Sequence, residues 1–364
     1  MRPAGDTDPY ELGLPPMPED DPVVRWLLEG DPAIRWQVLR DLVQASESEV
    51  AAERARVARE GWGARLLASR GTDGLWANGA CFPGTAEFAT ATARALEAGE
   101  PPPPFPTSEV DQAGTTPEWP HEDAGQPWTA TYPVLLDLYH LGVPPDEPVM
   151  RETAELVARN CRWEYDGRPF FAGEVDCCIN AGTILIGTYH GVDVEEVVRR
   201  LLVDQMPDGG WNCWAQTRPA PGSFASTLDV VDALLRWERH TGGSEEVRRA
   251  RREGEEYLLQ RRLFRSLRTG EVVDQQWTQF SYPPRWHYDV LKATDYFARR
   301  GRVPDPRLSE AIDLVRAKRE PDGRWLLENS HPGATHVRFE EPDGTPSRWN
   351  TLRALRVLRW HDAS

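Results

Sequence analysis

The sequence predicts an all-α protein, an (α/α)6 toroid in which a ring of outer helices surrounds a ring of inner helices. One observation is a repeated glycine-rich turn that follows a helical stretch and ends in an aromatic residue, at Trp76, Phe170, Trp211, Trp277 and Trp325. Recurrence at roughly 40–60 residues is typical of stacked supersecondary units. The other observation is that helical stretches of two kinds alternate along the chain, while strand patterns are nearly absent.

Residues 205–211 (QMPDGGW) and 318–325 (KREPDGRW) carry the clearest form of this turn. Glycine adopts the left-handed conformation that ends a helix, so the Asp-Gly step is expected to stop each outer helix. The aromatic residue that follows is then expected to pack the turn against the next unit.

The outer helices are expected to be amphipathic and strongly charged, with apolar residues at i, i+3 and i+4. Their ranges are 47–70, 147–163, 193–205, 244–264 and 304–319, with 20–29 as a short first member. The inner helices are expected to be less charged, with small and aromatic residues, over 31–43, 128–142, 176–191, 223–241, 285–300 and 347–361. Arg-Trp pairs at 35–36, 285–286 and 348–349 predict equivalent positions in the array.

The 364 residues are predicted to form a disordered segment over 1–19 and one toroid domain over 20–364, with a Pro-rich insertion at about 84–127. A net charge of −16 without any basic block argues against nucleic acid and anionic lipid as partners. We see no signal peptide, no apolar run of membrane length and no C-x-x-C pair among five cysteines. These features favour a cytoplasmic protein with free thiols. The oligomeric state is left open.

The helix–turn–tryptophan repeats resemble those of the terpenoid cyclase and protein prenyltransferase toroids, and of single-toroid bacterial proteins called squalene cyclase-like. The two clearest turns look like the QW-type motifs of that superfamily. The resemblance implies an apolar, isoprenoid-like ligand in an aromatic central cavity at the N-termini of the inner helices. It also implies acid-initiated cyclisation as the reaction.

The candidate acid lies at the start of the third inner helix, where Glu174 and Asp176 precede two cysteines. This stretch resembles the Asp-x-Asp-Asp-Thr-Ala helix of squalene–hopene-type cyclases, with Asp176 at the acidic position and Cys177 at the third. An acid that protonates an alkene must lie in a dry cavity. The structural alternative is that Asp176 only caps the helix.

The same stretch resembles the zinc helix of the prenyltransferases, which implies Asp176, Cys178 and His287 as metal ligands. Zinc accepts such a mixed set and keeps a fourth position open for substrate. Zinc is thus the cofactor of one alternative, a prenyltransferase-like enzyme.

Aromatic and polar side chains at the starts of the inner helices form the expected ligand-binding set. Ring faces stabilise cations, and arginines hold carboxylates or diphosphates. The residues are Trp128, Tyr132, Phe224, Trp286, Tyr288, Trp349, Asn180, Arg285 and Arg348. The structural alternative is a packed aromatic core with an ion pair between Asp289 and the arginines.

Two further alternatives belong to other classes of protein. One is a non-catalytic ligand-binding or scaffold toroid. The other is a carbohydrate-active enzyme, which needs two carboxylates about 5–10 Å apart across the cavity, and Asp176 and Asp289 are the obvious pair. Ionisation of a diphosphate is disfavoured, because no Asp-Asp-x-x-Asp run lies on an inner helix.

Overall fold

The computed structural model describes residues 15–81, 128–164, 167–213, 220–301, 303–331 and 333–363. Helices dominate these residues, and their only named strands are the short β1 (Trp325–Leu326) and β2 (Pro346–Ser347), which pair antiparallel. Short helical turns occur at η2 (Ala77–Gly79), η3 (Phe170–Ala172), η5 (Gln275–Thr278) and η6 (Pro306–Leu308). The predicted all-α class is confirmed.

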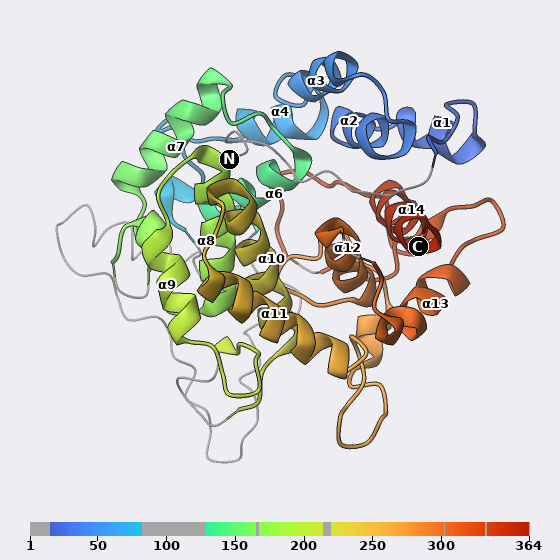
Figure 1. Cartoon of the computed structure of the whole chain (residues 1–364). Helices are drawn as coiled ribbons and strands as arrows, with labels where there is room; N and C mark the ends of the chain where they lie inside the picture. Colours follow the sequence, from blue (N-terminus) through green and yellow to red (C-terminus); the bar gives the residue numbers. More distant parts are fainter. Residues whose placement is uncertain are drawn as a thin grey trace.

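An inner ring of helices surrounds the centre of the molecule (Figure 1). Within the described residues the ring has six members: α2 (Pro32–Val38, continued by the π-helical turn η1, Leu39–Val43), α6 (Thr131–Leu141), α8 (Cys177–His190), α10 (Phe224–Thr241), α12 (Val290–Arg300) and α14 (Arg348–Asp362). Neighbours pack in chain order from α6 to α14, and α14 packs on α2. The indole Nε1 of Trp36 donates to the carbonyl of Leu141 at 2.9 Å, which joins α2 to α6. The ring is therefore closed.

The outer helices lie around this ring (Figure 1). They are α1 (Pro22–Leu28), α3 (Glu47–Arg56), α4 (Gly61–Ala68), α7 (Pro148–Asn160), α9 (Glu195–Val203), α11 (Glu245–Gln260) and α13 (Ser309–Ala317). The single helix expected over 47–70 is divided into α3 and α4. Its break falls at Gly61, whose φ of +64° is left-handed. Taken as outer–inner pairs, these helices give the predicted (α/α)6 toroid.

The inner position of α8 follows from its composition, since Cys177–His190 contains no Asp, Glu, Lys or Arg and most of it is buried. Close packing against α6 requires glycine at position 182. A Cβ atom at Gly182 would lie 2.0 Å from the hydroxyl oxygen of Tyr132. In contrast, α11 buries one stripe that includes Val247 and Leu258, and it exposes charged residues on its other side.

Three of the five predicted turns share one hydrogen-bond pattern. The indole nitrogens of Trp76, Trp211 and Trp325 donate to the carbonyl ten residues earlier, in the outer helices α4, α9 and α13, at 3.1, 2.7 and 2.7 Å. The backbone of each tryptophan is also bonded to a threonine hydroxyl of the next inner helix. Each turn therefore ties an outer helix to the inner helix that follows.

The fifth inner helix begins later than expected, at Val290 instead of residue 285. Asp289 is its N-cap and accepts a hydrogen bond from the backbone nitrogen of Lys292 at 2.7 Å. Arg285 has a left-handed φ of +51° and lies in the preceding loop. The three Arg-Trp pairs are therefore not equivalent, because one lies inside α2, one in this loop and one at the start of α14.

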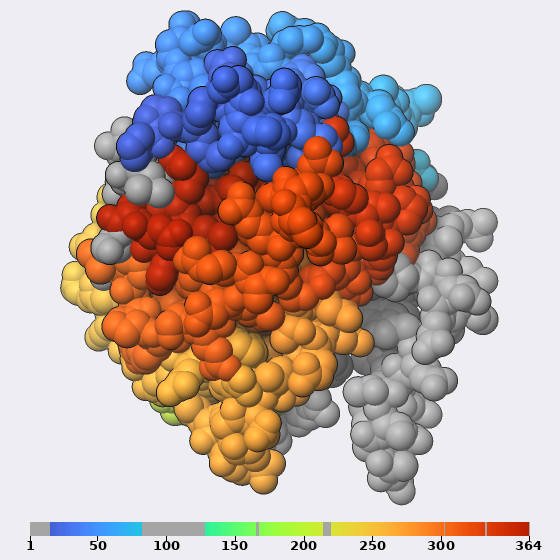
Figure 2. Space-filling view, turned by 90° about the vertical axis from the view of Figure 1, so that its right-hand side faces the viewer, coloured from blue at the N-terminus to red at the C-terminus, as the bar shows by residue number. Residues whose placement is uncertain are grey.

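The two ends of the described chain meet at the closure of the ring. Figure 2 shows the blue N-terminal helices against the orange and red C-terminal part. Arg348 donates to the carbonyl of Trp26 at 3.2 Å, and its guanidinium lies 4.6 Å from the centroid of that indole.

Part of the predicted domain organisation lies outside the described residues, namely the first fourteen residues and the whole of the insertion at 84–127. Residues 15–19 of the segment predicted as disordered are placed, and Met17 donates to the carbonyl of Leu42 at 2.8 Å. Within the described part of the chain, every helix is too short or too polar to span a bilayer.

Candidate functional site: a central cavity

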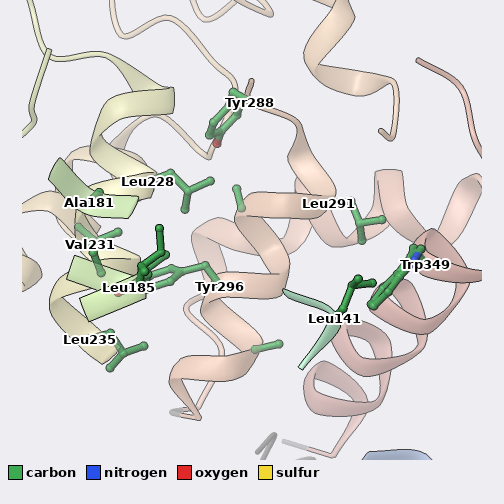
Figure 3. Close-up of a cluster of buried hydrophobic side chains, with 14 of the residues drawn as sticks. Leu141, Ala181, Leu185, Leu228, Val231, Leu235, Tyr288, Leu291, Tyr296 and Trp349 are labelled. Atoms are coloured by element: carbon green, nitrogen blue, oxygen red, sulfur yellow. The ribbon is translucent and has the colours of Figure 1, made fainter. Parts of the chain in front are cut away.

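A cavity of about 210 Å³ lies inside the inner ring. All six inner helices line it, together with the loop that precedes α12. Figure 3 shows Leu185 of α8, Leu228 of α10 and Tyr296 of α12 directed into the space between these helices. These three side chains contribute apolar wall to the cavity.

Aromatic rings from the starts of the inner helices and from the loop before α12 gather along the cavity wall. Trp128 and Trp286 lie with ring centroids 4.3 Å apart. Tyr282 and Trp349 stack at 4.4 Å with an interplanar angle of 11°. Tyr132 of α6 adds a further buried ring. Such faces bind apolar groups and also attract cations.

Ion pairs line another part of the cavity. Asp137 accepts from Arg285 at 2.6 Å, and Asp229 accepts from Lys292 at 2.8 Å. Burial raises the pKa of Asp137, although Arg285 opposes the rise. Burial also raises the pKa of Asp229 to about 6, against the opposing effect of Lys292. These charges are thus compensated by neighbours within the protein.

Arg353 of α14 differs from these paired groups. Its side chain is buried, with 6% exposure, and it lines the cavity. Its Nη1 donates to the carbonyl of Ser281 at 3.2 Å, and none of the described carboxylates lies within ion-pair distance of it. A guanidinium carries five N–H donors, and a buried cation is costly without a counter-ion. Arg353 therefore offers a fixed positive charge to an anionic group in the cavity.

The predicted acid, Asp176, lies at the N-cap of α8 but outside the cavity lining. Its carboxyl group makes no capping hydrogen bond, so the structural role expected for it is absent. Its backbone nitrogen donates to Glu174 at 2.6 Å. Burial, together with the nearby Cys213 and Glu174, raises the pKa of Asp176 to about 8. This shift favours the protonated form of the carboxyl group near neutral pH.

The other predicted acid, Asp289, is engaged in the fold. Besides capping α12, it accepts a hydrogen bond from the hydroxyl of Ser281 at 2.8 Å, and it is 1% exposed. Arg285 pairs with Asp137 and not with Asp289, contrary to expectation, because Arg285 lies in the loop and points at α6. Neither Asp176 nor Asp289 lines the cavity. The carboxylate pair expected for a carbohydrate-active enzyme is therefore not part of the cavity lining.

Five of the predicted ligand-binding residues line the cavity: Trp128, Tyr132, Arg285, Trp286 and Trp349. Four do not. Asn180 is bonded to both backbone groups of Glu174 at 2.7 Å, which fixes the loop before α8. Phe224 and Tyr288 pack on each other and on Trp277. Arg348 covers Trp26 at the closure of the ring.

The structure does not bring Asp176, Cys178 and His287 together as metal ligands. Among the described residues, no group of three or more His, Cys, Asp or Glu side chains is arranged to hold a metal ion. His287 instead stacks on His331, with ring centroids 3.7 Å apart, while Cys178 faces Cys213. The expected zinc set therefore has no support in this arrangement.

Asp137, Lys292 and Arg353 are among the charged cavity residues that sequence reasoning missed. A signal for one of them was present, because Trp349, Arg353 and Arg356 recur at i, i+4 and i+7 and share one face of α14. A charged residue that shares a helix face with an aromatic residue predicted to line the cavity indicates that the cavity is partly polar.

No family model and no curated protein matches the chain. Similar solved structures include a protein from Actinoplanes, with 17% identity and a TM-score of 0.34, over 85% of this chain and 98% of that one. They also include two structures of the type II terpene cyclase MstE from Scytonema, an apo form and a complex with geranylgeranyl dihydroxybenzoate. Their identities are 16% and 14%, both TM-scores are 0.34, and the alignments cover 85% and 86% of this chain and 94% and 97% of those. These scores are too low to assign a family or a substrate.

The fold and the cavity together define the structural class of this protein. The described residues form a closed ring of α/α pairs whose central cavity combines aromatic rings with Arg353, a buried arginine that has no ion-pair partner among them.

Proposed function

We propose that the central cavity binds a small isoprenoid-type molecule that carries an anionic group. The observation that carries this proposal is that Arg353 opens onto the same cavity as the rings of Trp128, Tyr282 and Trp349. The prenyl part would pack on these rings, and the anion would bind Arg353.

The two parts of the cavity act through different forces. Burial of apolar surface against aromatic walls stabilises the complex by roughly 25 cal/mol per Å². An anion on Arg353 gains charge-assisted hydrogen bonds, and two N–H groups of a guanidinium match the two oxygens of a carboxylate. Asp137 and Asp229 would not repel the ligand strongly, because each faces its own cation.

The test compares two probes with the same prenyl chain, farnesoic acid and the neutral alcohol farnesol, by isothermal titration calorimetry. The wild-type protein is expected to prefer the acid by at least tenfold. Arg353→Gln removes this preference and leaves farnesol binding nearly unchanged. Arg316→Gln is the matched control, because Arg316 forms an exposed ion pair with Asp362 far from the cavity lining. Equal affinity of the wild type for both probes refutes the anionic part of the proposal.

Acid-initiated cyclisation is the second candidate function, with Asp176 as proton donor. It is favoured by the raised pKa of Asp176 and by the position of this residue at the N-cap of α8, two residues before Cys178, which lines the cavity. The wild type is incubated with farnesoic acid or geranylgeranoic acid, and the products are analysed by mass spectrometry. A cyclised isomer that disappears in Asp176→Asn, with binding retained, supports this role. If the wild type returns the substrate unchanged, cyclisation is rejected and ligand binding is the only proposed function that remains.

The proposal also places the protein in the cytoplasm. All five cysteines are free thiols, as is usual in a reducing compartment.

A further inference from the structure

Three cysteine side chains meet where α8 and α10 begin. The sulfur atoms of Cys178 and Cys213 are 3.0 Å apart, and that of Cys177 is 3.5 Å from Cys213. The hydroxyl oxygen of Ser226, in the first turn of α10, also lies 3.5 Å from the sulfur of Cys213. The chain has five cysteines in 364 residues, and three of them meet at this place.

The Trp211 turn fixes this geometry. Trp211 is anchored by its indole on Leu201 and by its backbone nitrogen on Thr227, at 2.7 and 3.0 Å. Cys213 follows two residues later and is thus held next to the start of α8. Cys177 and Cys178 are the first two residues of that helix, so their sulfur atoms are fixed by its first turn.

The five cysteine residues differ in exposure. Cys178 and Cys213 are partly exposed, and Cys178 lines the cavity. Cys177 is 4% exposed, and the remaining cysteines, Cys81 and Cys161, are fully buried elsewhere. Cys178 and Cys213 are therefore the most exposed of the five cysteines.

The surroundings also favour a reactive Cys213. The adjacent thiols of Cys177 and Cys178 hold the pKa of the Cys213 thiol below its usual range. The thiolate is the nucleophilic form of cysteine.

We propose that Cys213 and Cys178 form a peroxide-reactive dithiol that closes to an intramolecular disulfide. The Cys213 thiolate attacks one oxygen of hydrogen peroxide, the O–O bond breaks, and a sulfenic acid and hydroxide form. The Cys178 sulfur then attacks the Cys213 sulfur, and the sulfenic oxygen leaves as water after taking up the thiol proton. Overall, two thiols are oxidised, one peroxide is reduced, and two waters are released.

The geometry requires little movement. A disulfide has an S–S length of about 2.05 Å, so the two sulfur atoms must approach by about 1 Å from their present separation. Cys177 lies close enough to exchange with the new bond. Because Cys178 lines the cavity, the disulfide would alter the cavity wall, although the chemistry does not depend on which ligand the cavity binds.

The test uses the reduced, folded wild-type protein, treated with one to ten equivalents of hydrogen peroxide and then alkylated. Trypsin separates the two cysteine segments at Arg199 and Arg200, so the disulfide appears as a cross-linked pair of peptides in non-reducing mass spectrometry. We expect this pair to form first, with the loss of two hydrogens. Cys161→Ala is the control and should leave it unchanged.

In Cys178→Ala, dimedone is expected to trap the sulfenic acid on Cys213, or a Cys177–Cys213 disulfide forms. Cys213→Ala is expected to slow thiol oxidation by at least tenfold. The measurement on the wild-type protein tests the proposal even if neither variant folds. The proposal is overturned if tenfold peroxide leaves Cys178 and Cys213 unlinked, or if Cys81 and Cys161 oxidise first.

Discussion

Trp349 stacks on Tyr282 with ring centroids 4.4 Å apart and planes inclined by 11°. The two residues come from the first turn of α14 and from the loop before α12. Trp62, near the start of α4, also stacks on Trp349, with ring centroids 6.2 Å apart. The stack therefore joins three elements distant in sequence, and its inner end is a wall of the cavity.

Replacement of Trp349 tests the role of this wall in binding. The indole nitrogen is buried without a hydrogen-bond partner, so Trp349→Phe removes ring area without breaking a hydrogen bond. We expect Trp349→Leu to weaken farnesoic acid binding about tenfold, which is about 1.4 kcal/mol, and Trp349→Phe to weaken it less. Calorimetric titration gives both values. Unchanged affinity in the leucine variant would place the prenyl chain elsewhere.

Replacement of Trp211 tests the repeated turn. Trp211→Phe removes the donor to Leu201 and leaves a buried carbonyl unpaired, together with a small void. We expect a loss of about 2–3 kcal/mol in the free energy of unfolding, measured by urea denaturation. Trp237→Phe is the control, since Trp237 is only partly buried and no hydrogen bond of its indole holds the fold. Equal losses in both variants would mean that the turn is not a specific anchor.

Acidification is expected to destabilise the fold through His287 and His331. Burial and the adjacent His331 lower the pKa of His287 to about 3, and burial and Lys292 lower that of His331 to about 4. Both values lie below the unfolded value of about 6.5, so the unfolded chain binds more protons. The two neutral histidines contribute their full stabilisation of the fold above pH 6.5, and this contribution is lost as the pH falls toward 4.

Denaturation at pH 7.5 and 5.0 measures this effect. We expect the wild type to lose about 1 kcal/mol per histidine at the lower pH, on a scale of 1.36 kcal/mol per pKa unit and discounted for partial exposure. The double variant His287→Gln/His331→Gln should lose less than the wild type over the same interval. A wild type whose stability rises on acidification would contradict the assigned pKa direction.

The turns share their hydrogen bond where two conditions are met: the aromatic residue follows the outer helix at the right spacing, and its ring has an N–H to donate. Phe170 has the expected spacing, since the residue ten positions earlier is Asn160 at the end of α7, but a phenyl ring has no N–H to donate. For Trp277 the same offset leads to Leu267, beyond the end of α11 at Gln260, so this turn packs through its ring on Phe224 instead. A repeat can thus be recognised by composition although its hydrogen bond is lost.

The site was less predictable than the fold. Trp128, Trp286 and Trp349 line the cavity, whereas Phe224 and Tyr288, which the same reasoning selected, pack elsewhere. Asp137 and Lys292 were missed because each is compensated by a partner far away in the sequence, Arg285 and Asp229. Such pairs depend on which helices become neighbours, and a helical periodicity does not contain that information.

The most direct measurement of the central claim is a crystal structure of the protein with farnesoic acid. The account predicts that the carboxylate lies about 2.7–3.1 Å from the guanidinium of Arg353, which is the usual distance of a charge-assisted hydrogen bond. It also predicts the prenyl chain against the rings of Tyr282 and Trp349. An empty cavity at saturating ligand, or a carboxylate directed away from Arg353, would contradict it.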